Sequence, residues 1–238
     1  MDRLQLLSFE IGRTCNLAAV HPWCPVNAPG RYLSDRAIAD GEILAWAESC
    51  KAAGFAGLVC FHYYNEPMVQ LPRVVGLAVA LRELLGLRAG LWTNGELIDP
   101  TRLDWVAAFD KVWITDHNPA RRALYQSLVL QFPGTVHLKS GGHDSRLQIG
   151  QGRQRVPRPC YRPTCTEMIV DNEGRLHLCC TDWPGETQIG NVLHDLHADL
   201  LIRWRAVAEA ARGGALPVCA KCQGLARSAY VGNQDHKI

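Results

Sequence analysis

Short apolar segments alternate with helical segments over residues 1–140, and this alternation constrains the fold more than any other feature. The expected strands are residues 5–11, 57–62, 88–93, 111–115 and 135–139. The expected helices are residues 34–53, with Ser34 or Asp35 as the cap, then 71–85, 102–108 and 119–132. Strands that alternate with helices of this length indicate βαβ units and a parallel sheet. The predicted fold class is therefore α/β.

Polar side chains follow several of the expected strands. Cys15 comes after the first strand, Glu66 after the second, Asn94 after the third and Asp116 after the fourth. In parallel α/β sheets, ligands bind beyond the carboxyl ends of the strands. We therefore expect these four side chains to line one site.

Cysteines crowd the C-terminal part of the chain. Six of the ten lie in one region, namely Cys160, Cys165, Cys179, Cys180, Cys219 and Cys222. Gly174 permits the tight turn of a strand pair around residues 171–174, and the second strand of that pair leads to Cys179. Two residues separate Cys219 from Cys222, so one turn supplies two ligands.

Four thiolates make a closed site for zinc or an iron–sulfur cluster. Cys165 and Cys180 are surplus to a site of four ligands, and either is able to replace a neighbour. The spacing alone does not decide between Cys179 and Cys180. Scattered buried cysteines remain the structural alternative.

The composition narrows the function class. A formal net charge of +2 and a pI of about 8.1 do not mark a nucleic-acid binder. The sequence has neither the apolar region of a signal peptide nor the run of about 20 apolar residues that a membrane span needs. We expect a cytoplasmic protein with no nucleic-acid or membrane partner. Because disulfides are rare in reducing compartments, the cysteines point to metal ligation.

The sequence resembles radical S-adenosylmethionine (SAM) enzymes that carry a C-terminal SPASM/twitch extension. The stretches that resemble the extension are residues 160–163, 171–182, 189–192 and 216–222. In the first half, Glu66-Pro67 resembles the family's Gly-Glu-Pro segment, and Thr93-Asn94-Gly95 matches its Thr-Asn-Gly. Residues 12–17, which include Cys15, match the start of the cluster loop.

The resemblance implies a fold, cofactors and ligands. The fold would be a partial (β/α)6-type barrel over residues 1–140, a linker over 141–159 and a small SPASM/twitch domain over 160–238. The cofactors would be SAM and one or two [4Fe–4S] clusters. The expected SAM or substrate contacts are Tyr64, Asn65, Glu66, Pro67, Asn94 and Asp116, with Glu66 receiving the SAM amino group. The expected auxiliary-cluster ligands are Cys160, Cys179, Cys219 and Cys222.

The cluster loop departs from the family's pattern of three cysteines, Cys-x3-Cys-x2-Cys. Only Cys15 and Cys24 are present, and His21 stands where the middle cysteine would lie if the first gap had grown to five residues. Imidazole replaces thiolate in Rieske centres, so a Cys15/His21/Cys24 site is chemically reasonable, although it should raise the reduction potential. The alternative is that His21 is an ordinary loop residue and that this cluster is weak or absent.

The resemblance implies reductive cleavage of SAM and hydrogen abstraction from a small-molecule or peptide substrate. A reductant protein such as flavodoxin or ferredoxin would supply electrons. One alternative is a degenerate relative that keeps only the auxiliary cluster and acts as a binding or electron-transfer partner. A zinc-binding module is a further alternative, but it leaves the Glu66 and Asn94 segments unexplained.

Overall fold

The computed structural model describes residues 4–31, 33, 36–141, 167–180 and 182–221. The predicted linker, except residue 141, lies outside these residues, and so do the predicted ligands Cys160 and Cys222. The boundaries of the predicted domains therefore stay predictions.

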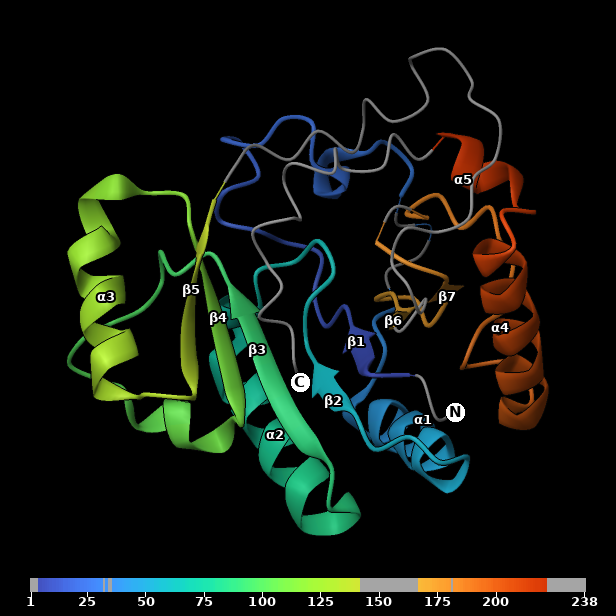
Figure 1. Cartoon of the computed structure of the whole chain (residues 1–238), viewed down its shortest axis with the longest axis horizontal. Coiled ribbons are helices and arrows are strands. Elements are labelled where there is room, and N and C mark those ends of the chain that lie inside the picture. The colour runs from blue at the N-terminus through green and yellow to red at the C-terminus, as the bar shows by residue number, and fades with distance from the viewer. Residues whose placement is uncertain (1–3, 32, 34–35, 142–166, 181, 222–238) are drawn as a thin grey trace.

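A seven-stranded sheet runs through the centre of the molecule (Figure 1). Its strands are β1 (Leu6–Phe9), β2 (Leu58–Cys60), β3 (Arg88–Thr93), β4 (Lys111–Asp116), β5 (Val136–Ser140), β6 (Glu167–Val170) and β7 (Leu176–His177). The spatial order is β5-β4-β3-β2-β1-β6-β7, and only the β6–β7 pair is antiparallel. The α/β class and the five strands predicted in the first half are confirmed.

The C-terminal strand pair extends the same sheet. Strand β6 pairs with β1 in parallel, with Leu6 opposite Glu167, and then turns back into β7. Gly174 adopts a φ of +82° in the turn, a conformation that glycine reaches at little cost. The predicted strand pair is confirmed, and its sheet partner is the first strand of the chain.

Helices cover the sheet. They are α1 (Asp40–Ala52), α2 (Leu71–Leu85), α3 (Arg122–Gln131), α4 (His197–Arg212) and α5 (Pro217–Lys221), with short 3-10 helices η1 (Pro25–Asn27), η2 (Pro67–Gln70), η3 (Asp104–Ala108) and η4 (Pro119–Arg121). Helix α2 packs on β3, α3 packs on β4 and β5, and α1 contacts both α2 and α4. Figure 1 shows α3 at one end of the sheet and α4 at the other. In the described part of the chain, no helix combines the length and the apolar character that a membrane crossing requires.

The first helix starts later than the sequence predicts. The expected cap was Ser34 or Asp35, but the helix begins at Asp40 with Ala39 as its N-cap. The N–H of Ile38 donates to the carbonyl of Asn172 at 2.8 Å, so this backbone is held in a long-range contact and does not enter the helix. The Glu42 carboxylate accepts the Ala39 N–H at 2.8 Å and so caps the observed N-terminus of the helix.

The two faces of the sheet differ in character. Leu91, Val112 and Ile114 are fully buried in the main core beneath the helices. Their neighbours Trp92 and Trp113 point to the opposite face, where they form a small separate cluster. We call this opposite side the inner face of the sheet.

Candidate functional site

Three of the predicted motifs meet at the carboxyl ends of the strands. Glu66 follows β2, Asn94 follows β3, and Cys15 lies in the loop after β1. Asn94 contacts both of the others through hydrogen bonds, and the Glu66 N–H donates to the carbonyl of Thr14 at 2.9 Å. The parallel sheet therefore brings together residues that lie 28 to 79 positions apart in the sequence.

Glu66 is a buried carboxylate that is held by several donors. Oε1 accepts the Thr93 hydroxyl at 2.7 Å and the Met68 N–H at 3.0 Å, and Oε2 accepts the Asn94 N–H at 2.8 Å. Burial raises the pKa of Glu66, although these three hydrogen bonds act in the opposite direction. A carboxylate offers about four acceptor positions, so the Glu66 oxygens have capacity for one further donor.

Asn94 links the loop after β1 to the end of β3. Its Nδ2 donates to Asn16 Oδ1 at 2.8 Å and makes a weaker contact with Cys15 Sγ at 3.8 Å. Burial, the largest cause, and the nearby Glu66 charge raise the pKa of the Cys15 thiol. The hydrogen bonds from Leu17 and Asn94 oppose that shift.

The loop between Cys15 and Cys24 is a chain of turns. The Cys24 N–H donates to the His21 carbonyl at 2.9 Å, and Asn27 Nδ2 donates to the same carbonyl at 3.0 Å. The buried His21 ring packs edge-on against the ring of His117 at 4.6 Å between centroids. This contact joins the loop to the residues that follow β4.

Ligation of a cluster by Cys15, His21 and Cys24 stays a prediction. Within the described ranges, no three His, Cys, Asp or Glu side chains are arranged to hold a metal ion. The donor types nevertheless suit an iron–sulfur cluster, because two thiols and one imidazole are soft to borderline ligands.

The other residues of the Glu66 segment have structural contacts. Asn65 Oδ1 accepts the Tyr63 N–H at 3.1 Å, and its Nδ2 donates to the Phe61 carbonyl at 3.3 Å, so this side chain closes a local turn. Pro67 opens η2, and Glu66 caps that short helix. The hydroxyl of Tyr64 donates to the Cys180 carbonyl. The predicted SAM contacts of Tyr64, Asn65 and Pro67 are not tested by these contacts.

Asp116 ends β4 as a buried carboxylate. Its Oδ2 accepts Arg122 Nε at 2.5 Å. Its Oδ1 is buried and has no hydrogen-bond partner among the residues that the structure describes. A buried acceptor without a partner is uncommon, which makes Asp116 a candidate ligand contact.

Sequence reasoning missed a buried ion pair beside the site. Arg31 Nη2 lies 2.7 and 2.8 Å from the two carboxylate oxygens of Glu10, and the Glu10 side chain is fully buried. Glu10 also accepts the backbone N–H groups of Tyr64 and Asn172, each at 3.3 Å. The Arg31 guanidinium lies 4.4 Å from the Tyr64 ring centroid. This network ties the loop after β1 to the residues that follow β2 and to the β6–β7 turn.

The two adjacent C-terminal cysteines face different surroundings. Cys179 packs against the main core, as does Cys219. Cys180 packs against a small cluster of Tyr63, Tyr64 and Ile169, and Cys24 packs against the same cluster. Cys180 therefore lies on the side of the N-terminal loop.

The backbone conformation at position 95 and the crowding around it both call for glycine. We therefore expect Gly95→Ala to lower the free energy of unfolding by about 3 kcal/mol. Its φ is +77°, and a Cβ there would lie 2.8 Å from both Ile114 and Tyr125. Gly134→Ala is a matched control, because Gly134 has a φ of +79° and nothing within 4 Å of the added carbon. The free energy of unfolding of that control should fall by only about 1 kcal/mol, because the left-handed backbone is its only cost. Chemical denaturation measures both, and equal losses would contradict the crowding at Gly95.

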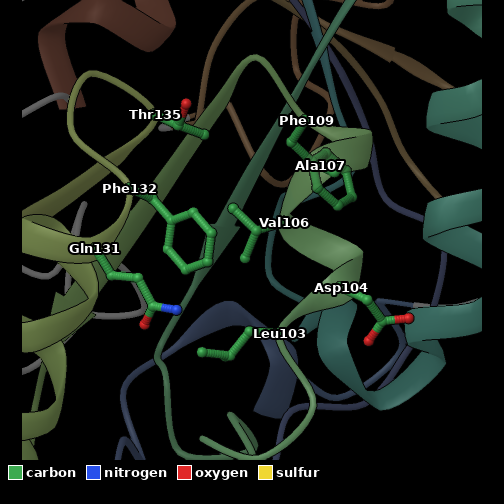
Figure 2. Close-up of a pocket in the computed structure, with 8 residues that line it drawn as sticks. All are labelled: Leu103, Asp104, Val106, Ala107, Phe109, Gln131, Phe132 and Thr135. Carbon is green, nitrogen blue, oxygen red and sulfur yellow. The ribbon is translucent and has the colours of Figure 1, made fainter.

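A cavity of about 520 Å³ lies away from these residues, at the amino ends of β4 and β5. Figure 2 shows its lining, which comes from η3 and from the segment around Phe132. The side chains are mostly apolar, and none is a predicted site residue. In parallel sheets the chemistry gathers at the carboxyl ends, so we place the candidate site there and not in this cavity.

No family model matches the sequence, and no curated protein matches it either. Several solved structures are similar in fold, and two of them are structures of BtrN. A structure of BtrN in complex with AdoMet and 2-DOIA superposes with a TM-score of 0.70 and 18% sequence identity, covering 91% of this chain and 92% of that one. A structure of selenomethionine BtrN in an open conformation gives a TM-score of 0.63 and 18% identity, covering 94% of each chain. The predicted fold is thereby confirmed: this chain has the α/β partial-barrel fold seen in BtrN.

Proposed function

We propose that this protein is a radical SAM enzyme that abstracts a hydrogen atom from a small-molecule or peptide substrate, aided by an auxiliary [4Fe–4S] cluster. A reduced [4Fe–4S] cluster, when bound, supplies the electron that cleaves SAM to the 5′-deoxyadenosyl radical. The observation that carries the proposal is the contact between the Cys15, Glu66 and Asn94 segments at one edge of a BtrN-like sheet.

Three donors would hold the first cluster. They are Cys15, His21 and Cys24, which share one turn-rich loop. The contact of Asn94 Nδ2 with Cys15 Sγ keeps this loop against the end of β3. A site with three protein ligands would leave one iron open for SAM.

Carboxylates would bind SAM. Glu66 has acceptor capacity left after its three hydrogen bonds, which suits the SAM ammonium group. The buried Oδ1 of Asp116 is a second acceptor for SAM or the substrate. The same carboxyl edge of the sheet would be shaped by Tyr64, Asn65, Pro67 and Asn94. BtrN holds AdoMet together with 2-DOIA, which favours a second ligand next to SAM on this fold.

The auxiliary cluster would use Cys160, Cys179, Cys219 and Cys222. The shared packing of Cys179 and Cys219 against the main core supports Cys179 over Cys180. A flavodoxin or ferredoxin would supply the electrons. These ligands and partners remain expectations from the sequence.

A degenerate relative without radical initiation is the second candidate, favoured by a loop that contains two cysteines and a buried His21. Iron and sulfide analysis after anaerobic reconstitution tests the proposal against it. We expect about eight irons and as many sulfides per chain for two clusters. About four irons would favour the degenerate protein, and zinc without sulfide would favour a zinc module.

A further inference from the structure

A row of aromatic rings crosses the inner face of the sheet. Trp92 is paired with Trp113 across β3 and β4, and Trp113 is paired with His137 across β4 and β5. The two indoles stack at 3.7 Å between centroids with 17° between their planes. His62, which follows β2, stacks on the other side of Trp92 at 4.7 Å. Four neighbouring strands therefore present one continuous aromatic surface.

This aromatic row is separate from the packing that holds the helices on the sheet. Trp92 and Trp113 belong to the small inner-face cluster, whereas the main core lies on the other side. Trp92, His62 and His137 each remain partly exposed. His62 and Trp113 cover the two faces of Trp92, so the row offers ring edges, which pack well against an apolar part of a ligand.

Lys139 lies over the two indoles. Its Nζ is 5.2 Å from the Trp92 centroid and 5.5 Å from the Trp113 centroid, which is within cation–π range. Among the residues that the structure describes, Lys139 forms no ion pair within 4 Å. The Glu167 carboxylate attracts its charge without reaching that distance.

The register places Lys139 close to the candidate site. Lys139 is paired with Thr115, and continuing the β3–β4 register by one residue places Asn94 level with Thr115. The Lys139 backbone thus lies one pleat nearer the carboxyl edge than the aromatic row, on the level of Asn94, and its ammonium lies back over the two indoles. A group bound there would sit beside the proposed SAM site.

We propose that the substrate is a small anion, whose carboxylate or phosphate binds Lys139 while a hydrocarbon ring packs against the edges of the Trp92–Trp113 pair. The cation supplies charge complementarity, and the indoles supply a surface for the ring. This inference rests on the proposed function only in taking the inner face as the substrate side.

Four probes test the two halves of this site on the full-length protein without reductant. Cyclohexanecarboxylate and cyclohexyl phosphate carry the ring and an anion, cyclohexanecarboxamide carries the ring without charge, and acetate carries the charge without the ring. Titrations followed by ligand-detected NMR give each dissociation constant. We expect at least one ring anion to bind about tenfold more tightly than the amide and than acetate. The better of the two ring anions identifies the carboxylate or the phosphate as the preferred group.

Variants assign the binding to Lys139. Lys139→Met should weaken the preferred ring anion about tenfold and leave the amide unchanged. Lys51→Met is the matched control, because Lys51 lies in the last turn of α1, away from the inner face, and its Nζ donates to the Leu85 carbonyl. That control should bind the ring anion as the wild type does.

The pH dependence gives an independent check. Burial lowers the pKa of Lys139 to about 8, so the affinity for the ring anion should be full below that pH and fall as pH rises through it. The neighbouring groups do not reproduce this loss: burial keeps the pKa of the Cys60 thiol far above its ordinary value, and burial with Lys111 lowers the pKa of His137. The Glu167 carboxylate is the other charged group that acts on Lys139, and it favours the protonated ammonium.

Absence of binding by both ring anions, equal binding of the amide, or an unchanged constant in Lys139→Met would overturn the inference. None of these measurements requires an assembled cluster or cleavage of SAM. Failure of the proposed substrate class is therefore distinguishable from failure of the proposed radical SAM function.

Discussion

Replacing Arg31 with Met is expected to lower the free energy of unfolding by about 3–5 kcal/mol. The substitution removes the Arg31 cation from the fully buried Glu10 carboxylate, and breaking a buried ion pair by removing one partner is costly. The two backbone N–H groups that donate to Glu10 are at 3.3 Å and cannot replace a guanidinium at 2.7 Å. Because the pair joins β1 to the loop after Cys24, thermal and chemical denaturation should both register the loss.

Two comparison variants isolate the cause. Arg36→Met removes an arginine from an exposed pair with Glu42 and should cost about 0.5 kcal/mol or less. The double variant Glu10→Gln/Arg31→Met removes both charges and should be more stable than Arg31→Met alone. Equal losses for Arg31→Met and Arg36→Met would contradict the role given to the buried pair.

Replacing Cys15 with Ala is expected to abolish the formation of 5′-deoxyadenosine from SAM while the chain remains folded. Cys15 is the first thiol of the loop, and its sulfur lies against Asn94 at the proposed SAM edge. Cys15 is only partly buried, so the loss of stability should be small. Chromatographic detection of 5′-deoxyadenosine under a strong reductant measures the effect.

Cys50→Ala is the matched control for Cys15→Ala. Cys50 is fully buried in α1 within the main core, and burial holds the pKa of its thiol well above the ordinary value. Its replacement should cost stability, on the order of 1 kcal/mol, and leave product formation intact. Wild-type product formation by Cys15→Ala would remove the N-terminal loop from the reaction.

The sequence alone predicted the sheet and the meeting of the motifs. Alternating strands and helices imply a parallel sheet, and a parallel sheet places the carboxyl ends of its strands at one edge. From that rule follow the contacts of Asn94 with Cys15 and Glu66, which the structure contains. These features were predictable because each depends on local periodicity and on a general property of the fold.

Features that depend on distant partners were not predictable. The ion pair of Glu10 with Arg31 joins the residue after β1 to a loop 21 residues away, and no local sequence pattern predicts it. The late start of α1 follows from the contact of Ile38 with Asn172, more than 130 residues apart. Large aromatic side chains such as Trp92 and Trp113 are usually buried in the main core. The register of three strands aligns them instead on the inner face with His137.

Anaerobic reconstitution of the wild-type protein, followed by reduction and assay of SAM turnover, tests the central claim most directly. We predict 5′-deoxyadenosine in the presence of strong reductant and none in its absence. Protein that carries its full complement of iron and sulfide, yet forms no 5′-deoxyadenosine, would contradict the assignment of this fold to radical SAM chemistry.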